Sequence, residues 1–209
     1  MSAVLTKSAF VGLLKAAQQK IKENFDYLNQ LDSATGDGDH GTAAVAALDA
    51  AVNKGVEDLD AGKGFAEILS DIGWSIMTET SGTTSSLIGS LFLGMSEAAP
   101  SDELTPAETR TMFEAGLANV QTMTDAKPGD KTLMDAMVPG IEAMKGNDTS
   151  FAVLFVAAAE ASAKGAEATK DLKARFGRAR NLGERSAGHI DAGATSMSLI
   201  FKAFAESEV

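Results

Sequence analysis

The chain has no cysteine, and basic side chains are scarce beside acidic ones. Without cysteine it cannot form disulfides, thiolate metal sites or a thiol nucleophile. Its 18 lysines and arginines stand against 29 aspartates and glutamates, which leaves a net charge of −11. Nucleic acids and anionic membranes are themselves negative and would repel such a protein. The composition therefore argues against both as general partners.

Long apolar runs are also missing. The longest one, residues 151–159, is far too short to span a bilayer. Near the N-terminus, Lys7 and Lys15 interrupt any stretch that could form a secretory signal. The chain has no internal repeat and no linker rich in proline, glycine or serine. We therefore expect a single domain over residues 1–209 in a cytoplasmic protein.

Apolar side chains at helical spacing are abundant. Steps of one, three or four residues place them on one face of a helix. Such stripes run over residues 10–28, 65–76, 87–95, 134–144 and 200–204. Residues 151–168 begin as an apolar run that could be a buried strand, but their alanine-rich continuation favours helix.

Helix start signals agree with these stripes. Thr105-Pro106-Ala107-Glu108 is a capping box with proline at the first helical position. Thr42, Ser81 and Ser150 are further N-cap candidates. Together the stripes and caps predict about eight helices and no strand. The fold class expected is all-α, with amphipathic helices packed on one another.

Four segments break the helical pattern: residues 31–42, 80–86, 124–131 and 176–193. They are polar and rich in glycine, and two of them are longer than a helical bundle needs for its connections. Long polar connections of this kind are where functional residues usually lie. We therefore expect the functional residues in these four segments.

The first segment brings together three carboxylates, Asp32, Asp37 and Asp39, interleaved with glycines. Clustered carboxylates repel one another unless a cation offsets their charge. Hard oxygen donors on a flexible loop suit Mg²⁺, Ca²⁺ or Mn²⁺, and the spacing is not that of an EF-hand. The alternative is a solvated acidic turn. The third aspartate, the adjacent His40 and a helix start at Gly41-Thr42 favour the metal site.

A helix beginning near Thr42 would direct its free N–H groups toward these carboxylates. A phosphate between a metal ion and a helix N-terminus would satisfy both. Residues 80–86, rich in serine and threonine, open another helix in the same way but alone are a weak signal. Neither segment is a Walker A loop, and no Rossmann fingerprint follows a strand.

The last segment gathers Arg178, Arg180 and Arg185 in an otherwise acidic chain. Arginine suits phosphate oxygens, whereas a structural role would pair it with a nearby carboxylate such as Glu184 or Asp191. Both histidines lie beside glycine and aspartate, which makes a buried structural histidine the less favoured interpretation. We expect Lys131 to be solvated and Trp74 to lie in the core or at an interface.

Four motifs now stand in order along the chain: GDGDHG at residues 36–41, KPGDKT at 127–132, GRA at 177–179 and LGERSAGHIDAGATS at 182–196. Together they resemble the nucleotide-binding L subunits of dihydroxyacetone kinases, over essentially the whole chain. The resemblance implies a closed barrel of eight antiparallel amphipathic helices with the nucleotide site at one end.

The resemblance also implies functional residues. Asp32, Asp37 and Asp39 would bind two Mg²⁺ ions that bridge the phosphates of ADP or ATP. The residues implied to bind the nucleotide are His40, Gly41, Thr42, Ala43, Thr83, Thr84, Thr124, Leu133, Arg178, Asp191, Ala192 and Gly193. No residue is assigned a catalytic role. The reaction implied is phosphoryl transfer to an alcohol, stabilised by metal ions and N–H groups.

In this family a separate K subunit holds the substrate, a small ketose, so we expect this chain to be inactive alone. Either a phosphocarrier subunit of a phosphotransferase system rephosphorylates bound ADP, or ATP exchanges. A homodimer is a further expectation. Alternatives are a kinase subunit for another small ketose or polyol, a fatty acid kinase domain, and a non-catalytic helical module that docks on a regulator.

Overall fold

The computed structural model describes residues 4–208, and most of them are helical, which confirms the all-α expectation. The elements follow in the order β1 (Leu5–Thr6), α1 (Lys7–Glu23), α2 (Phe25–Ser33), α3 (His40–Asp60), α4 (Phe65–Glu79), α5 (Thr83–Ser96), β2 (Glu103–Leu104), α6 (Pro106–Met123), α7 (Met134–Glu142), α8 (Phe151–Ala168), the 3₁₀ helices η1 (Thr169–Asp171) and η2 (Arg178–Ser186), and α9 (Ala192–Glu206).

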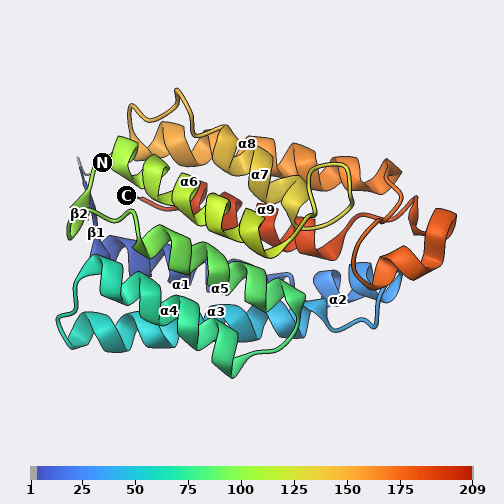
Figure 1. Ribbon diagram of the computed structural model, residues 1–209, viewed down its shortest axis with the longest axis horizontal. Helices are drawn as coiled ribbons and strands as arrows, with labels where there is room; N and C mark the ends of the chain where they lie inside the picture. The colour runs from blue at the N-terminus through green and yellow to red at the C-terminus, as the bar shows by residue number, and fades with distance from the viewer. Residues whose placement is uncertain (1–3, 209) are drawn as a thin grey trace.

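The long helices lie side by side along the long axis of the molecule (Figure 1). Helix α1 packs against α3 and α9, α4 lies between α3 and α5, α6 follows α5, and α8 lies between α7 and α9. Both ends of the chain lie at one end of the bundle, whereas α2 and η2 lie at the other (Figure 1). This second end is where the four polar segments converge.

Side-chain caps explain why several helices begin where they do. The Thr105 hydroxyl accepts from Glu108 N, and the Glu108 carboxylate accepts from Thr105 N at 2.8 Å, so the predicted capping box is confirmed. Ser150 also caps α8 as predicted. The predictions for Thr42 and Ser81 are wrong. Thr42 lies inside α3, which begins at His40, and Ser81 precedes Gly82, the N-cap of α5.

The structure corrects two further expectations about the backbone. The stripe over residues 10–28 belongs to two helices, because Asn24 leaves helical geometry with φ −107° and ψ 15° between α1 and α2. The expectation of no strand is also wrong, since β1 pairs antiparallel with β2 through Leu5 and Leu104. These strands have only two residues each, too few to show an alternating pattern.

One apolar core joins all the long helices. Where α4 meets α5 the backbones approach closely, because a Cβ at Gly73 or Gly89 would stand 2.9 Å from the carbonyl oxygen of the other glycine. Trp74, in contrast, is 56% exposed on α4, so its placement in the core is wrong and a role at an interface stays a prediction. None of the described helices is long and apolar enough to cross a membrane.

Candidate nucleotide and metal site

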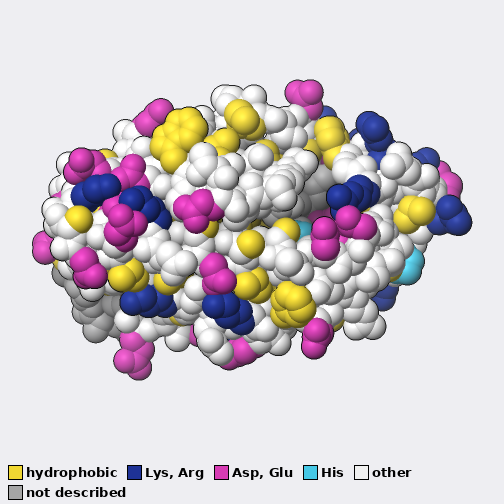
Figure 2. Space-filling model, turned by 90° about the horizontal axis from the view of Figure 1, so that it is seen from below, with side chains coloured by type: hydrophobic (Ala, Val, Ile, Leu, Met, Phe, Trp, Pro, Cys, Tyr) yellow, Lys and Arg dark blue, Asp and Glu magenta, His cyan; other side chains and the backbone are white. Residues whose placement is uncertain are grey.

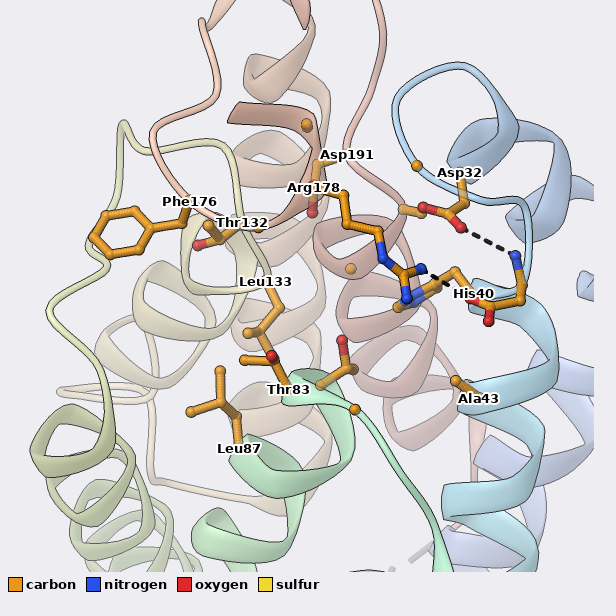
Figure 3. A pocket seen from close by; sticks show the side chains of 18 of the residues that line it. Asp32, His40, Ala43, Thr83, Leu87, Thr132, Leu133, Phe176, Arg178 and Asp191 are labelled. Atoms are coloured by element: carbon orange, nitrogen blue, oxygen red, sulfur yellow. Dashed lines mark hydrogen bonds and ion pairs between the residues drawn. The ribbon is translucent and has the colours of Figure 1, made fainter. Parts of the chain in front are cut away.

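A cavity of about 890 Å³ opens at the end of the bundle where α3, α5 and α9 begin. Figure 3 shows His40 and Thr83, from the starts of α3 and α5, and Arg178 from the C-terminal loop lying around the same space. On the face drawn in Figure 2, acidic and basic side chains gather beside a hollow. All four segments that break the helical pattern thus contribute to this cavity.

The three predicted metal ligands lie together. One carboxylate oxygen from each of Asp32, Asp37 and Asp39 falls within 4.8 Å of the others. Asp32 is in the last turn of α2 and not in a loop, and its Oδ2 accepts from the backbone N–H groups of Gly38 (2.8 Å) and Asp39 (3.0 Å). Position 38 favours glycine, because its φ is +80°. The turn is therefore folded around the Asp32 carboxylate.

Arg178 approaches this cluster from the C-terminal loop. Its guanidinium forms ion pairs with Asp37 and, at 3.7 Å, with Asp39. All three side chains are exposed. The structural pairing considered for the loop arginines, with Glu184 or Asp191, is not what Arg178 does, and Glu184 pairs with Lys173 instead. The arginine and the carboxylates offer charges of both signs at the cavity mouth.

His40 is buried as the first residue of α3, so the interpretation as a loop histidine is wrong. Its Nε2 lies 2.9 Å from the Ser196 hydroxyl, which itself donates to the Gly193 carbonyl at 2.9 Å. A hydroxyl has one proton, so when it is used in that second bond, His40 Nε2 is the group that donates to Ser196. Burial lowers the pKa of His40, which favours the neutral ring. Ser196 was not predicted as a site residue.

Two helix starts face the cavity. Thr42 and Ala43 line it from the first turn of α3, and Thr83 and Thr84 do so from the first turn of α5. The predicted Gly41 does not line it. Its N–H donates to Asn29 Oδ1 at 2.7 Å, and a Cβ there would stand 2.5 Å from the Phe25 carbonyl oxygen. Gly41 therefore serves the packing of α3 against α2.

Another part of the wall is less polar. Thr124 and Leu133, both predicted, line it together with Leu87 and Ala126, which were not predicted. Figure 3 shows Leu87 and Leu133 near each other. Three of these four side chains are apolar and buried. A flat aromatic ring such as a purine would find apolar contacts here, while a charged group would be better placed at the helix starts.

The turn over residues 127–132 contains buried charges that sequence patterns did not reveal. Lys131, expected to be solvated, is 1% exposed and has a left-handed φ of 62°. Asp135 is buried nearby and accepts from Gly129 N and Thr132 N, each at 2.7 Å. Burial lowers the pKa of Lys131 and raises the pKa of Asp135. Lys131 lines the cavity, and Asp135 holds the turn that carries it through these two backbone bonds.

Asp191 lies at the start of α9. Its Oδ1 accepts from Ala194 N at 2.7 Å, and its own N–H donates to the Thr169 hydroxyl at 2.9 Å. Withdrawal from water raises the pKa of the Asp191 carboxyl to about 6. Ala192 and Gly193 line the cavity beside it, as expected from the motif.

The DAK2 domain matches residues 34–206 of this chain. The chain belongs to the DAK2 domain family. A relative from Listeria innocua, named the ADP-binding subunit DhaL of PEP-dependent dihydroxyacetone kinase 1, is 33% identical over 195 residues, 91% of each protein. These findings confirm the family that the four motifs indicated.

Larger proteins contain a similar unit. The D-erythrulose kinase of Mycolicibacterium smegmatis is 32% identical over 199 residues, which are 91% of this chain and 34% of that enzyme. The crystal structure of the dihydroxyacetone kinase from C. freundii in complex with AMP-PNP and Mg²⁺ matches with a TM-score of 0.72 at 24% identity, over 95% of this DAK2 chain and 33% of that one. This second likeness shows a shared fold, in which the chain spans about a third of the larger protein.

Proposed function

We propose that this DAK2 protein is the nucleotide-binding subunit of a dihydroxyacetone kinase-type phosphotransferase, which phosphorylates an alcohol group of a small ketose. The observation that carries the proposal is the position of three converging carboxylates beside the start of α3, on a cavity of about 890 Å³. A cavity of this size accommodates a nucleotide. The relative named as an ADP-binding subunit over nearly its whole length supports the same assignment.

The donor set fits Mg²⁺. Asp32, Asp37 and Asp39 offer hard carboxylate oxygens within 4.8 Å of one another, which is the chemistry that Mg²⁺ prefers. We propose two Mg²⁺ ions. Their four positive charges would face the three carboxylates and the roughly three negative charges of a diphosphate. Arg178 and the helix N-termini offset the remainder. Bound Mg²⁺ would supply charge neutralisation for the phosphoryl group.

The nucleotide's orientation follows from the two kinds of wall. The phosphates would lie at the helix starts that His40, Thr42, Ala43, Thr83 and Thr84 form, where backbone N–H groups are available. The base would lie against Leu133 and Thr124. Residues 178 and 191–193 would close over the phosphates from the C-terminal side. In this role the chain's own residues bind and orient the nucleotide and exclude water from it.

The ketose would be held by a separate K subunit, and the γ-phosphoryl group would pass to it across the interface. The name of the Listeria relative, "PEP-dependent", favours a phosphocarrier that rephosphorylates bound ADP over exchange of ATP. We further propose that the ring of neighbouring helices closes as a barrel, that residues 1–209 form one domain, that the protein works in the cytoplasm, and that it can pair as a homodimer.

One observation favours a second substrate. The M. smegmatis relative is named D-erythrulose kinase, so a four-carbon ketose is an alternative acceptor. The cavity described above would take the nucleotide in either case, because the choice of sugar would rest with the substrate-binding subunit. The other alternative is a regulatory helical module without catalysis, which the experiment below must distinguish from a kinase subunit.

The experiment combines two measurements on purified protein. Native mass spectrometry should find retained ADP if a phosphocarrier acts on it in place. Added to a ketose-binding K subunit and the matching phosphoryl donor, the protein should produce ketose phosphate from dihydroxyacetone or erythrulose, and neither protein should do so alone. Absence of nucleotide binding, or absence of ketose phosphate in the complete mixture, would contradict the proposal.

A further inference from the structure

The buried lysine of the 127–132 turn has no role in the function proposed above. Lys131 Nζ donates to the carbonyl oxygen of Thr169 at 2.6 Å and also to that of His189. Thr169 directly follows α8, and His189 comes shortly before α9. The two carbonyls thus lie at opposite ends of one loop, residues 170–188, which carries η2 and Arg178. A single ammonium group joins both ends.

Neighbouring bonds identify this place as the base of the loop. Gly188 N donates to the Lys170 carbonyl at 2.7 Å, and Asp191 N donates to the Thr169 hydroxyl at 2.9 Å. The first part of the loop also rests on the turn that contains Lys131, because Arg175 N donates to the Asp130 carbonyl at 3.1 Å. Several hydrogen bonds therefore hold the base of the loop together, and the Lys131 ammonium adds two more.

The backbone around Lys131 is arranged for this contact. A φ of 62° is unusual for a residue with a side chain and costs conformational energy, yet Lys131 adopts it and is 1% exposed. A lysine at the surface would keep its ammonium in water. Here the ammonium is withdrawn from water and donates to two carbonyl oxygens instead, with the charges of Asp191 and Asp135 nearby. A neutral side chain would leave both carbonyls without this donor.

We propose that Lys131 is a positioning residue, which holds the base of the loop so that Arg178 stands over the nucleotide phosphates. The proposal rests on the proposed function, since it names a residue that serves the same site. Lys131 acts through Arg178: it ties the loop ends, the loop carries η2, and the guanidinium at the start of η2 reaches the Asp37 and Asp39 carboxylates.

A thermodynamic cycle tests this. Lys131→Met removes the donors but keeps an apolar stem, and the matched control is Lys127→Met, an exposed lysine in the same turn. ADP affinity in Mg²⁺ is measured for wild type, Lys131→Met, Arg178→Ala and the double variant. We expect Lys131→Met to weaken ADP binding about tenfold, as for a lost charge-assisted contact. In the Arg178→Ala background the same change should cost less than about twofold, and Lys127→Met should cost nothing.

Hydrogen exchange provides the second readout and needs no nucleotide. Amides over residues 170–190 should exchange at least about tenfold faster in Lys131→Met than in wild type or Lys127→Met, while α4 and α5 stay unchanged. Lys131→Arg, which keeps the charge and donors, should recover part of the ADP affinity. If Lys131→Met does not melt cooperatively, Lys131→Gln takes its place in the cycle with the same expectations.

Two results would overturn the proposal. One is unchanged exchange over residues 170–190; the other is a loss of ADP affinity that simply adds to that of Arg178→Ala, as a merely structural role would give. Failure of the proposed function looks different, because neither the wild-type protein nor any variant would then bind ADP. The exchange measurement would still decide whether Lys131 holds the loop.

Discussion

Replacing Asp37 by asparagine removes one charge from the carboxylate cluster with little change of shape. The ligand oxygens lie within 4.8 Å of one another, so each pair repels by at least about 0.9 kcal/mol in water. Losing one carboxylate removes two of three such repulsions, about 1.8 kcal/mol, which favours the metal-free variant. The direct attraction between Mg²⁺ and a carboxylate oxygen at about 2.1 Å, about 4 kcal/mol in water, is lost as well.

Asparagine and water replace part of that attraction, so we expect Asp37→Asn to weaken ADP binding in Mg²⁺ by at least about tenfold, or 1.4 kcal/mol. Without Mg²⁺ the variant should be as stable as wild type or slightly more so, because relieved repulsion offsets the lost ion pair with Arg178. Calorimetric titration of ADP, with MgCl₂ or with EDTA at matched ionic strength, measures the affinities.

The matched control is Asp60→Asn, an exposed carboxylate at the far end of α3. It should leave both the ADP affinity and its dependence on Mg²⁺ unchanged. The reasoning is refuted if Asp37→Asn keeps the wild-type affinity in Mg²⁺, or if wild-type protein binds ADP equally well in EDTA.

Two further predictions concern stability. Gly165→Ala should destabilise the fold by about 2 kcal/mol in urea unfolding, because the new Cβ would overlap the Asp135 carbonyl oxygen. Its control, Gly12→Ala, has open space around the new Cβ and should be neutral or stabilising. Equal effects of the two changes would contradict this account of the packing. Since burial raises the pKa of Asp191 to about 6 from an unfolded value near 3.9, its ionisation lowers stability as pH rises between these values, by about 3 kcal/mol. Asp191→Asn, which can still cap α9, should therefore stabilise at pH 7.5 but not below about pH 4; a gain independent of pH would contradict this.

Much of the fold could be predicted because the apolar stripes record which helix faces are buried. The stripe over residues 65–76 and the Thr105 capping box depend only on local spacing, and both are found as predicted. The break at Asn24 could not be found this way, since the apolar residues of α2 continue the stripe of α1 across it. The β1–β2 pair escaped for another reason: it joins residues about a hundred positions apart.

The candidate site was predictable where its residues are close in sequence. Asp32, Asp37 and Asp39 share one segment, and the structure brings their carboxylates together. Lys131 was misjudged because its partners, the Thr169 and His189 carbonyls, are backbone groups from a distant segment that no side-chain pattern records. The pairing of His40 with Ser196 could not be predicted either, because these residues are far apart in sequence and meet only near the starts of α3 and α9.

The most direct test of the central claim is a crystal structure of the protein grown with ADP and MnCl₂, in which anomalous scattering locates the cation. We expect manganese at the carboxylates of Asp32, Asp37 and Asp39, with the diphosphate between the metal and the start of α3. Manganese absent from these carboxylates, or ADP bound elsewhere on the molecule, would contradict the account.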